Sequence, residues 1–281
     1  MKKPFVVGAG IMGSGIGQLC AQQGYGVTVV DISEEIVERA KGKVSAGLSR
    51  RVEKGKITQD EMESVLSRIN WSTDLELAKE SDFIVEAASE NLELKKDLFA
   101  KLDSICPPGT ILATNTTALS VSEIASATSR PDKVIGMHFF NPAVIMKLVE
   151  IIRGEKTSEE TIATTKKFAE DLGKIPIATS KEAPAGIVSR VLGGLLNEAV
   201  VVYSEGIASA EDIDEAMKLG AGLPMGPLAL IDMIGLDIHL AKMETVYGKL
   251  KDERYKPPEL IKKMVAEGKL GKKSGEGFYK Y

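Results

Sequence analysis

The sequence is poor in several residue types that decide protein class. Its 281 residues include two histidines, two cysteines and one tryptophan. Two cysteines, Cys20 and Cys106, cannot build a disulfide framework and suit a reducing cytosol, so we expect a cytoplasmic protein. No run of about 18 apolar residues exists to form a membrane-spanning helix. Gly8, Gly10 and Gly13 interrupt the apolar stretch after the N-terminal lysines, so we also expect no signal peptide.

Positive charge is not in excess either. The chain carries 36 lysines and arginines against 40 acidic residues, a formal net charge of −4. Without a global positive field we expect no nucleic-acid partner and no membrane surface, and any polyanionic ligand must be met by a local basic patch. With 43% hydrophobic and 27% charged residues the composition is that of a globular protein, and the length favours two domains.

The first 180 residues alternate short apolar runs rich in β-branched residues with segments of helical period, which predicts an α/β domain with a mostly parallel sheet. The expected strands are 5–7, 27–31, 83–86, 110–114, 134–139, 148–152 and 175–178. About fifty residues separate the second strand from the third, more than one crossover helix needs, and they predict a helical hairpin insertion. Its second arm should begin at Thr58, with Glu61 as the partner in a capping box.

After residue 184 only helical periodicity remains. We therefore predict an α/β domain over residues 1–184 and an all-helical domain over residues 185–281, with helices that begin at Ser209, near Pro227 and near Pro258. Several of these helices are apolar on more than one face. The surplus apolar surface predicts a homodimer formed through the helical domain.

The run Gly8-Ala9-Gly10-Ile11-Met12-Gly13 follows an expected strand and opens an expected helix. In that setting the first glycine permits a tight turn, the second admits a pyrophosphate, and the third lets helix and strand pack closely. Asp31 ends the second strand 18 residues later, where a carboxylate can bind both adenosine ribose hydroxyls. A Rossmann-type NAD site is predicted, and NAD is favoured over NADP because a 2′-phosphate would meet the charge of Asp31.

The scarcity of histidine shortens the search for a general base. His138 ends an apolar strand at the edge where open α/β sheets bind ligands, and Glu150 interrupts another apolar strand, so that its carboxylate needs a partner. A glutamate that accepts from one imidazole nitrogen leaves the other free to take a hydroxyl proton. From these features alone, a structural His138 and a Glu150 paired with an arginine fit equally well. We expect His239 to be structural, and the spacing of the histidines and cysteines predicts no metal site.

These residues together resemble the L-3-hydroxyacyl-CoA dehydrogenase family over nearly the whole chain, and the length is closest to that of its bacterial 3-hydroxybutyryl-CoA members. The resemblance rests on seven motifs: Gly8-Ala9-Gly10-Ile11-Met12-Gly13, Val85-Glu86-Ala87-Ala88, Glu90-Asn91, Asn115-Thr116, Gly136-Met137-His138-Phe139-Phe140-Asn141-Pro142, Leu148-Val149-Glu150 and Gly271-Lys272-Lys273-Ser274-Gly275-Glu276-Gly277-Phe278-Tyr279. It implies NAD-dependent oxidation of a short-chain 3-hydroxyacyl-CoA, with His138 as base and Glu150 orienting it. The residues expected at the cofactor are Gly8, Gly10, Ile11, Met12, Gly13, Asp31, Ala88, Glu90, Lys95, Asn115 and Asn141.

Two positions depart from the family pattern. Thr117 stands where the family usually has a serine that touches the substrate oxygen, and this change keeps the hydroxyl. Ser189 stands where the family usually has asparagine, so the side chain that should hold the thioester or keto oxygen has no amide donor. We expect both residues at the substrate.

An acyl-CoA must also find positive charge for its phosphates. Arg50 and Lys54 share one helix face at i, i+4 in the predicted hairpin, and the family uses basic residues there for CoA. We expect Arg50 and Lys54 to bind the substrate. The alternative is a solvated basic face beside Glu53.

Other functions share this pattern in part. The β-hydroxyacid dehydrogenases use a lysine on the long helix between domains, and residues 189–197 contain none. The remaining alternatives are a dehydrogenase on the same scaffold that acts on a free hydroxy acid or sugar acid, and a non-catalytic NAD-binding protein.

Overall fold

The computed structural model describes residues 3–183 and 185–281, so Pro184, at the predicted domain boundary, lies outside the described residues. The chain divides into two compact units, Met1–Ala183 and Pro184–Tyr281. We call them the N-terminal and C-terminal units. No helix among the described residues has the length and apolarity that crossing a bilayer requires.

The N-terminal unit is built on one eight-stranded sheet in the order β3-β2-β1-β4-β5-β6-β7-β8. All neighbouring strands are parallel except β6 and β7, which are antiparallel. The strands are β1 (Pro4–Val7), β2 (Val27–Val30), β3 (Ile69–Ser72), β4 (Phe83–Glu86), β5 (Ile111–Thr114), β6 (Val134–Phe139), β7 (Leu148–Arg153) and β8 (Ile175–Ala178). The predicted α/β domain with a mostly parallel sheet is confirmed.

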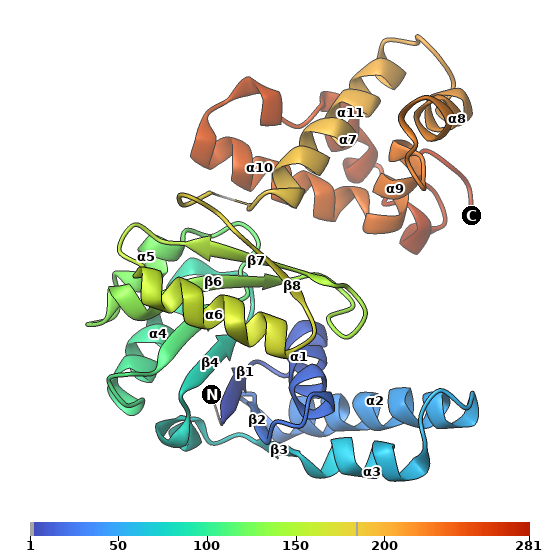
Figure 1. Cartoon of the computed structure of the whole chain (residues 1–281). Coiled ribbons are helices and arrows are strands. Elements are labelled where there is room, and N and C mark those ends of the chain that lie inside the picture. The colour runs from blue at the N-terminus through green and yellow to red at the C-terminus, as the bar shows by residue number, and fades with distance from the viewer. Residues whose placement is uncertain (1–2, 184) are drawn as a thin grey trace. The chain divides into compact units, whose positions relative to one another are not determined.

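Helices cover both faces of this sheet (Figure 1). They are α1 (Ile11–Gln22), α2 (Glu34–Glu53), α3 (Gln59–Ser67), α4 (Leu92–Ile105), α5 (Val121–Ala125) and α6 (Glu159–Asp171), with short 3₁₀ turns at Leu75–Glu80 and Pro131–Lys133. Successive residues of a strand point to opposite faces, so Val6 packs into the core beneath α1 and α6 while Phe5 and Val7 pack into the core beneath α4. This double layer leaves the carboxyl edge of the sheet open for loops.

The predicted hairpin insertion is confirmed, and the segment also holds a strand that the sequence did not indicate. Helices α2 and α3 form the hairpin, and Thr58 and Glu61 make the expected capping box. Residues 69–72 then add β3 to the edge of the sheet. Only Ile69 of this strand is buried, so the alternation that marks a half-buried strand is absent.

The C-terminal unit is all helical in its described part. It contains α7 (Val188–Ser204), α8 (Ala210–Ala221), α9 (Pro227–Ile234), α10 (Leu236–Leu250) and α11 (Glu259–Ala266), with 3₁₀ turns at Glu253–Tyr255 and Lys272–Ser274. Ser209 caps α8 and Pro227 begins α9, as the sequence predicts. Asp232 fastens the C-terminal tail to α9 by accepting hydrogen bonds from the backbone of Phe278 and Tyr279.

Candidate functional site

The glycine-rich turn joins β1 to α1, and each of its three glycines meets a different constraint. Gly8 has φ of 101°, and a Cβ there would lie 2.7 Å from the carbonyl oxygen of Ala87. A Cβ on Gly13 would overlap the carbonyl oxygen of Gly8. Among the described residues, apart from the neighbours of Gly10 and the backbone of its own helix, no atom lies within 4 Å of a Cβ placed on Gly10. The open space at Gly10 is therefore available to a ligand, as the sequence argument requires.

Helix α1 begins at this turn without a side-chain cap. Its N-cap is Gly10, and no side chain accepts from the amides of its first turn. The other α-helices of residues 3–183 begin with serine, threonine or asparagine caps that do so. Free amides and the positive end of the helix dipole favour an anion at this position.

Asp31 follows β2 and lies beside the turn. Its Oδ2 accepts from the amide of Ala9 at 2.6 Å and its Oδ1 from the amide of Ile32 at 2.7 Å, so both oxygens are held in place with lone pairs to spare. A cavity of about 340 Å³ opens at this carboxylate, with Ala88 and Leu94 in its wall. The cavity has room for an adenosine beside a carboxylate that can accept from ribose hydroxyls.

His138 and Glu150 lie directly opposite each other on β6 and β7. The Nδ1 of His138 is 3.0 Å from Oε2 of Glu150, and both side chains are buried. The antiparallel pairing of these two strands brings together residues twelve apart in the sequence. Because Glu150 accepts from an Nδ1–H, the Nε2 atom is left as a proton acceptor.

The loop after β5 presents Thr117 to this imidazole. Its hydroxyl lies 3.3 Å from Nε2 of His138. One carboxylate oxygen of Glu90 holds the loop, accepting from the Thr116 hydroxyl at 2.6 Å and from the amides of Thr117 and Ala118 at 2.9 and 3.0 Å. Four residues that the sequence predicts for the site, Glu90, Thr117, His138 and Glu150, thus form one connected cluster.

The two predicted asparagines lie at the same edge. Asn115 directly follows β5, and its side-chain oxygen accepts from the amide of Phe139, which fixes the end of β6 beside His138. Asn141 lies on the exposed loop two residues after β6, before a cis bond to Pro142.

Lys95, which is expected at the cofactor, is a buried residue of α4. It is 1% exposed, and its ammonium lies 2.6 Å from Glu86 and 3.2 Å from the carbonyl oxygen of Ala88. Glu86 also accepts from the hydroxyl of Thr114 and the amide of Ala88. The sequence analysis did not predict that Glu86 holds these groups together. A carboxylate inside the apolar run 83–86 is nevertheless the same signal that identified Glu150.

The residues expected to bind substrate are spread more widely. Arg50 lies in the last turn of α2 and Lys54 follows that helix, and both are exposed. Ser189 is a buried residue in the first turn of α7 in the C-terminal unit.

Comparison with known proteins finds relatives of one family along the whole chain. Residues 4–183 match the family model of the 3-hydroxyacyl-CoA dehydrogenase NAD binding domain, and residues 187–281 match that of the C-terminal domain of the same family. A probable 3-hydroxybutyryl-CoA dehydrogenase of Bacillus subtilis is 48% identical over 281 residues, which cover 100% of this chain and 98% of the relative.

Two solved structures extend the comparison. The crystal structure of the (S)-3-hydroxybutyryl-CoA dehydrogenase of Ralstonia eutropha is similar with a TM-score of 0.97 and 46% identity, covering 100% of this chain and 99% of that one. A diketoreductase that acts on dicarbonyl compounds is similar with a TM-score of 0.88 and 31% identity, again over 100% and 99%. With both domains matched and the relatives covered almost end to end, this chain belongs to the 3-hydroxyacyl-CoA dehydrogenase family.

Proposed function

We propose that the protein is an NAD-dependent dehydrogenase that interconverts (S)-3-hydroxyacyl-CoA and 3-ketoacyl-CoA, with 3-hydroxybutyryl-CoA and acetoacetyl-CoA as the substrate pair. The single observation that carries the chemistry is the buried His138–Glu150 pair, in which the Nε2 of His138 lies 3.3 Å from the hydroxyl of Thr117. The similar proteins named above support the substrate class.

The residues of the turn fit NAD. Open space at Gly10, uncapped amides at the start of α1 and the carboxylate of Asp31 would hold its pyrophosphate and adenosine. When bound, this cofactor supplies the hydride acceptor for oxidation. We assign Ile11, Met12, Ala88, Glu90, Asn115 and Asn141 to the same site because they line the turn or the loops at the carboxyl edge.

His138 acts as the general base. In oxidation, Nε2 takes the proton of the C3 hydroxyl while the hydride leaves C3, and in reduction the protonated imidazole returns it. Glu150 accepts from Nδ1–H and stabilises the imidazolium that forms. Thr117 donates to the substrate oxygen and fixes its distance from the base.

Lys95 acts by positioning. Its bonds to Glu86 and to the carbonyl of Ala88 hold the loop that follows β4, and Glu90 on this loop holds Thr117. We therefore assign Lys95 to the support of the cofactor loop, while Arg50 and Lys54 attract the phosphates of CoA and Ser189 holds a carbonyl oxygen of the substrate.

The test is the initial rate of NADH oxidation by the purified protein with acetoacetyl-CoA, compared with free acetoacetate and repeated with NADPH. We expect turnover with the CoA ester and NADH, and at least a tenfold lower rate with NADPH because of Asp31. A preference for the free acid would contradict the proposed substrate, and a preference for NADPH would contradict the proposed role of Asp31.

A second candidate is a reductase of small dicarbonyl compounds, favoured by the similarity to the diketoreductase. Turnover of a free diketone at a rate equal to that of acetoacetyl-CoA would support it. Variants that replace Arg50 and Lys54 separate the two functions, because they should raise the KM of the CoA ester alone.

We further propose a homodimer formed through the C-terminal unit, in a reducing compartment such as the cytoplasm. Val191, Leu219, Met233 and Ile238 are exposed apolar residues of this unit, and both cysteines are free and buried. In light scattering we expect a molar mass twice that of one chain. Leu219→Lys or Ile238→Lys should reduce it to the mass of one chain.

A further inference from the structure

Glu182 is the last charged residue of the N-terminal unit, and the reaction proposed above gives it no role. Its carboxylate binds residues that lie 60 and 62 positions earlier in the chain. Oε1 accepts from the hydroxyl of Ser120 at 2.7 Å and from the backbone amide of Ser122 at 3.0 Å, and Oε2 accepts from the hydroxyl of Ser122. Both oxygens of this carboxylate are therefore engaged by one distant segment.

That segment is the start of α5. Ser120 is the N-cap of the helix, and its side-chain oxygen accepts from the amide of Glu123 at 3.1 Å. Glu182 accepts from the amide of Ser122, another first-turn amide that has no partner inside the helix. A carboxylate there also meets the positive end of the helix dipole. Because a helix of five residues gains little from its own hydrogen bonds, contacts from outside decide where it begins.

The loop that presents Thr117 to His138 leads directly into this helix. Glu90 holds the first part of the loop by accepting from Thr116, Thr117 and Ala118. Glu182 holds the end of the same loop through Ser120, three residues after Thr117. The loop is thus tied to the rest of the unit by two carboxylates, one on each side of the sheet order in the sequence.

The start of α5 also packs closely against β6, the strand that carries His138. A Cβ on Gly136, two residues before His138, would lie 3.1 Å from a methyl carbon of Val121, which is closer than ordinary van der Waals contact. Helix and strand therefore meet without a side chain between them. A displacement of α5 along this surface would change the distance between Thr117 and His138, which is 3.3 Å from hydroxyl to Nε2.

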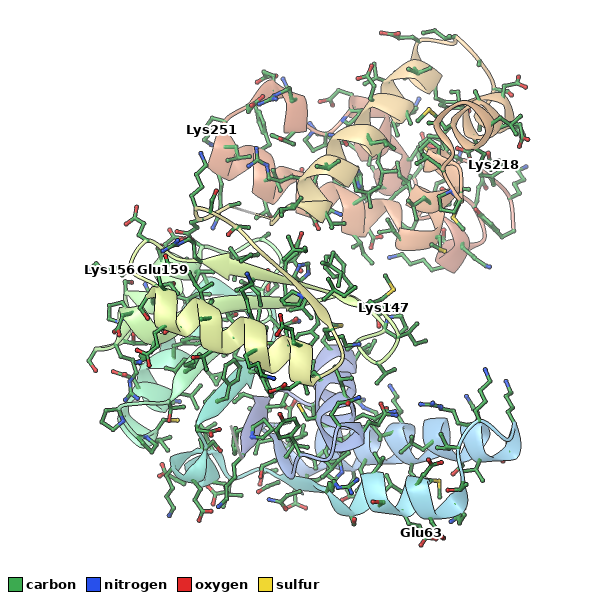
Figure 2. All side chains as sticks on the ribbon, in the orientation of Figure 1. Glu63, Lys147, Lys156, Glu159, Lys218 and Lys251 are labelled. Carbon is green, nitrogen blue, oxygen red and sulfur yellow. The ribbon has the colours of Figure 1, made fainter. Side chains whose placement is uncertain are left out.

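The turn between β7 and α6 borders the same contact. The amide of Glu155 donates to Oγ of Ser122 at 2.9 Å, and a Cβ on Gly154 would lie 3.3 Å from this oxygen. Lys156, labelled in Figure 2, lies on this turn. Since the Ser122 hydroxyl accepts from the turn and donates to Glu182, its orientation is fixed from both sides.

We propose that Glu182 is a positioning residue of the dehydrogenase reaction, an inference that rests on the proposed function. Its carboxylate fixes the loop so that Thr117 and His138 reach the same substrate oxygen. Glu182 acts through Thr117 and not by contact with the substrate. Because small errors in the placement of a reacting group slow a reaction strongly, loss of this tie lowers turnover. The cofactor site at the glycine-rich turn follows β1 and is unaffected.

The test compares Glu182→Ala with Glu182→Gln in the full-length protein. Alanine removes all three contacts, and we expect kcat/KM with acetoacetyl-CoA to fall about tenfold while NADH affinity stays within twofold. Glutamine keeps an oxygen for the Ser120 hydroxyl and the Ser122 amide, so its kcat/KM should remain within threefold of the wild type. A wild-type rate in Glu182→Ala, or an equal loss in both variants, would overturn the proposal.

A double-mutant cycle with Thr117→Val separates positioning from a general loss of stability. Because Glu182 acts through the Thr117 hydroxyl, the double variant should be at most threefold slower than Thr117→Val alone. Losses that multiply to about a hundredfold would overturn the proposal.

The matched control is Asp103→Ala. Asp103 also ties distant residues, accepting from the amide of Ser129 at 2.7 Å and from the side chain of Arg130, but these residues precede β6 and lie away from its carboxyl end. We expect lower resistance to urea with kcat/KM within twofold, and a loss as large as that of Glu182→Ala would overturn the proposal. If Glu182→Ala does not fold, Ser122→Ala replaces it, with an expected fall of about threefold and a wild-type rate as the contrary result.

Hydrogen exchange followed by mass spectrometry gives a readout that needs no turnover. In Glu182→Ala we expect the amides of residues 117–123 to exchange at least tenfold faster and those of residues 8–13 to be unchanged. An inactive wild type would contradict the proposed function. An active wild type whose exchange in residues 117–123 is not altered by Glu182→Ala would contradict this inference, so the two failures are distinguishable.

Discussion

Each of the two units buries one histidine, and their surroundings differ. In the N-terminal unit, His138 meets the carboxylate of Glu150 on one nitrogen and a hydroxyl on the other. In the C-terminal unit, the Nε2 of His239 lies 2.9 Å from the side-chain oxygen of Asn197, while Nδ1 is buried and has no partner among the described residues. A carboxylate compensates the charge of an imidazolium and a neutral amide does not, and this separates the surroundings of the two rings.

The pKa of His239 expresses this difference. Burial, with a smaller contribution from the charge of Lys242, lowers it from 6.5 to about 4. His239 is therefore neutral at physiological pH and serves as a hydrogen-bonded packing residue. Burial is common to both rings, so in the proposed mechanism it is the carboxylate of Glu150 that distinguishes His138 from His239.

The largest expected effect comes from His138→Gln. We expect kcat to fall by about 10² to 10⁴ because the variant cannot accept a proton, with NADH affinity unchanged. Stopped-flow turnover and a fluorescence titration of NADH measure the two quantities. Near-normal turnover would remove His138 from the mechanism and make the two histidines equivalent.

Glu150→Gln tests the partner of the base. The amide keeps the shape of the side chain and loses its charge, so we expect kcat to fall by about 10². Because Glu150 acts through His138, the double variant with His138→Gln should be no slower than His138→Gln alone. An additive loss in that double-mutant cycle would show that Glu150 acts by another route.

Thr117→Val tests the other side of the imidazole. Loss of one hydrogen bond to the reacting oxygen should lower kcat/KM by about tenfold. The matched control, Thr117→Ser, keeps the hydroxyl and should remain within threefold of the wild type. Equal losses in both variants would point to packing of the threonine methyl group instead.

The smallest effect on turnover is expected for His239→Gln, which should leave kcat within twofold of the wild type. The variant should instead change how the free energy of unfolding depends on pH. The folded pKa of His239 lies below its unfolded value, so the unfolded chain binds the proton first and stability falls as pH drops from 6.5 toward 4. This group should contribute a loss of about 3 kcal/mol at pH 4 relative to pH 7. Urea unfolding at both values should show a shallower fall for the variant, and equal falls would refute the assignment.

Much of this architecture follows from sequence because it rests on local signals. The glycine-rich turn, Asp31 and the capping box of α3 are set by neighbouring residues, and the structure has them where predicted. The strand β3 was not predicted, because an edge strand with one buried residue shows no clear alternation of apolar and polar residues.

The site could be foreseen only in part, since its remaining geometry depends on contacts between distant residues. Nothing local indicates that β6 and β7 are antiparallel, which is what places His138 opposite Glu150. Lysine is usually exposed, so the burial of Lys95 against Glu86 and of Lys174 against a loop is decided by tertiary packing.

The uncapped start of α1 also bears on how the protein tolerates heat. Gly10 has φ of −65° and ψ of −170°, a conformation that serine adopts without strain. A serine hydroxyl there would accept from the free amides of the first turn and stabilise the folded state by about 1 kcal/mol. In the proposed cofactor site, the same side chain would fill the space assigned to the pyrophosphate. A ligand that binds only the folded chain raises its stability with concentration, so we expect the free cofactor concentration to set part of the resistance of this protein to heat.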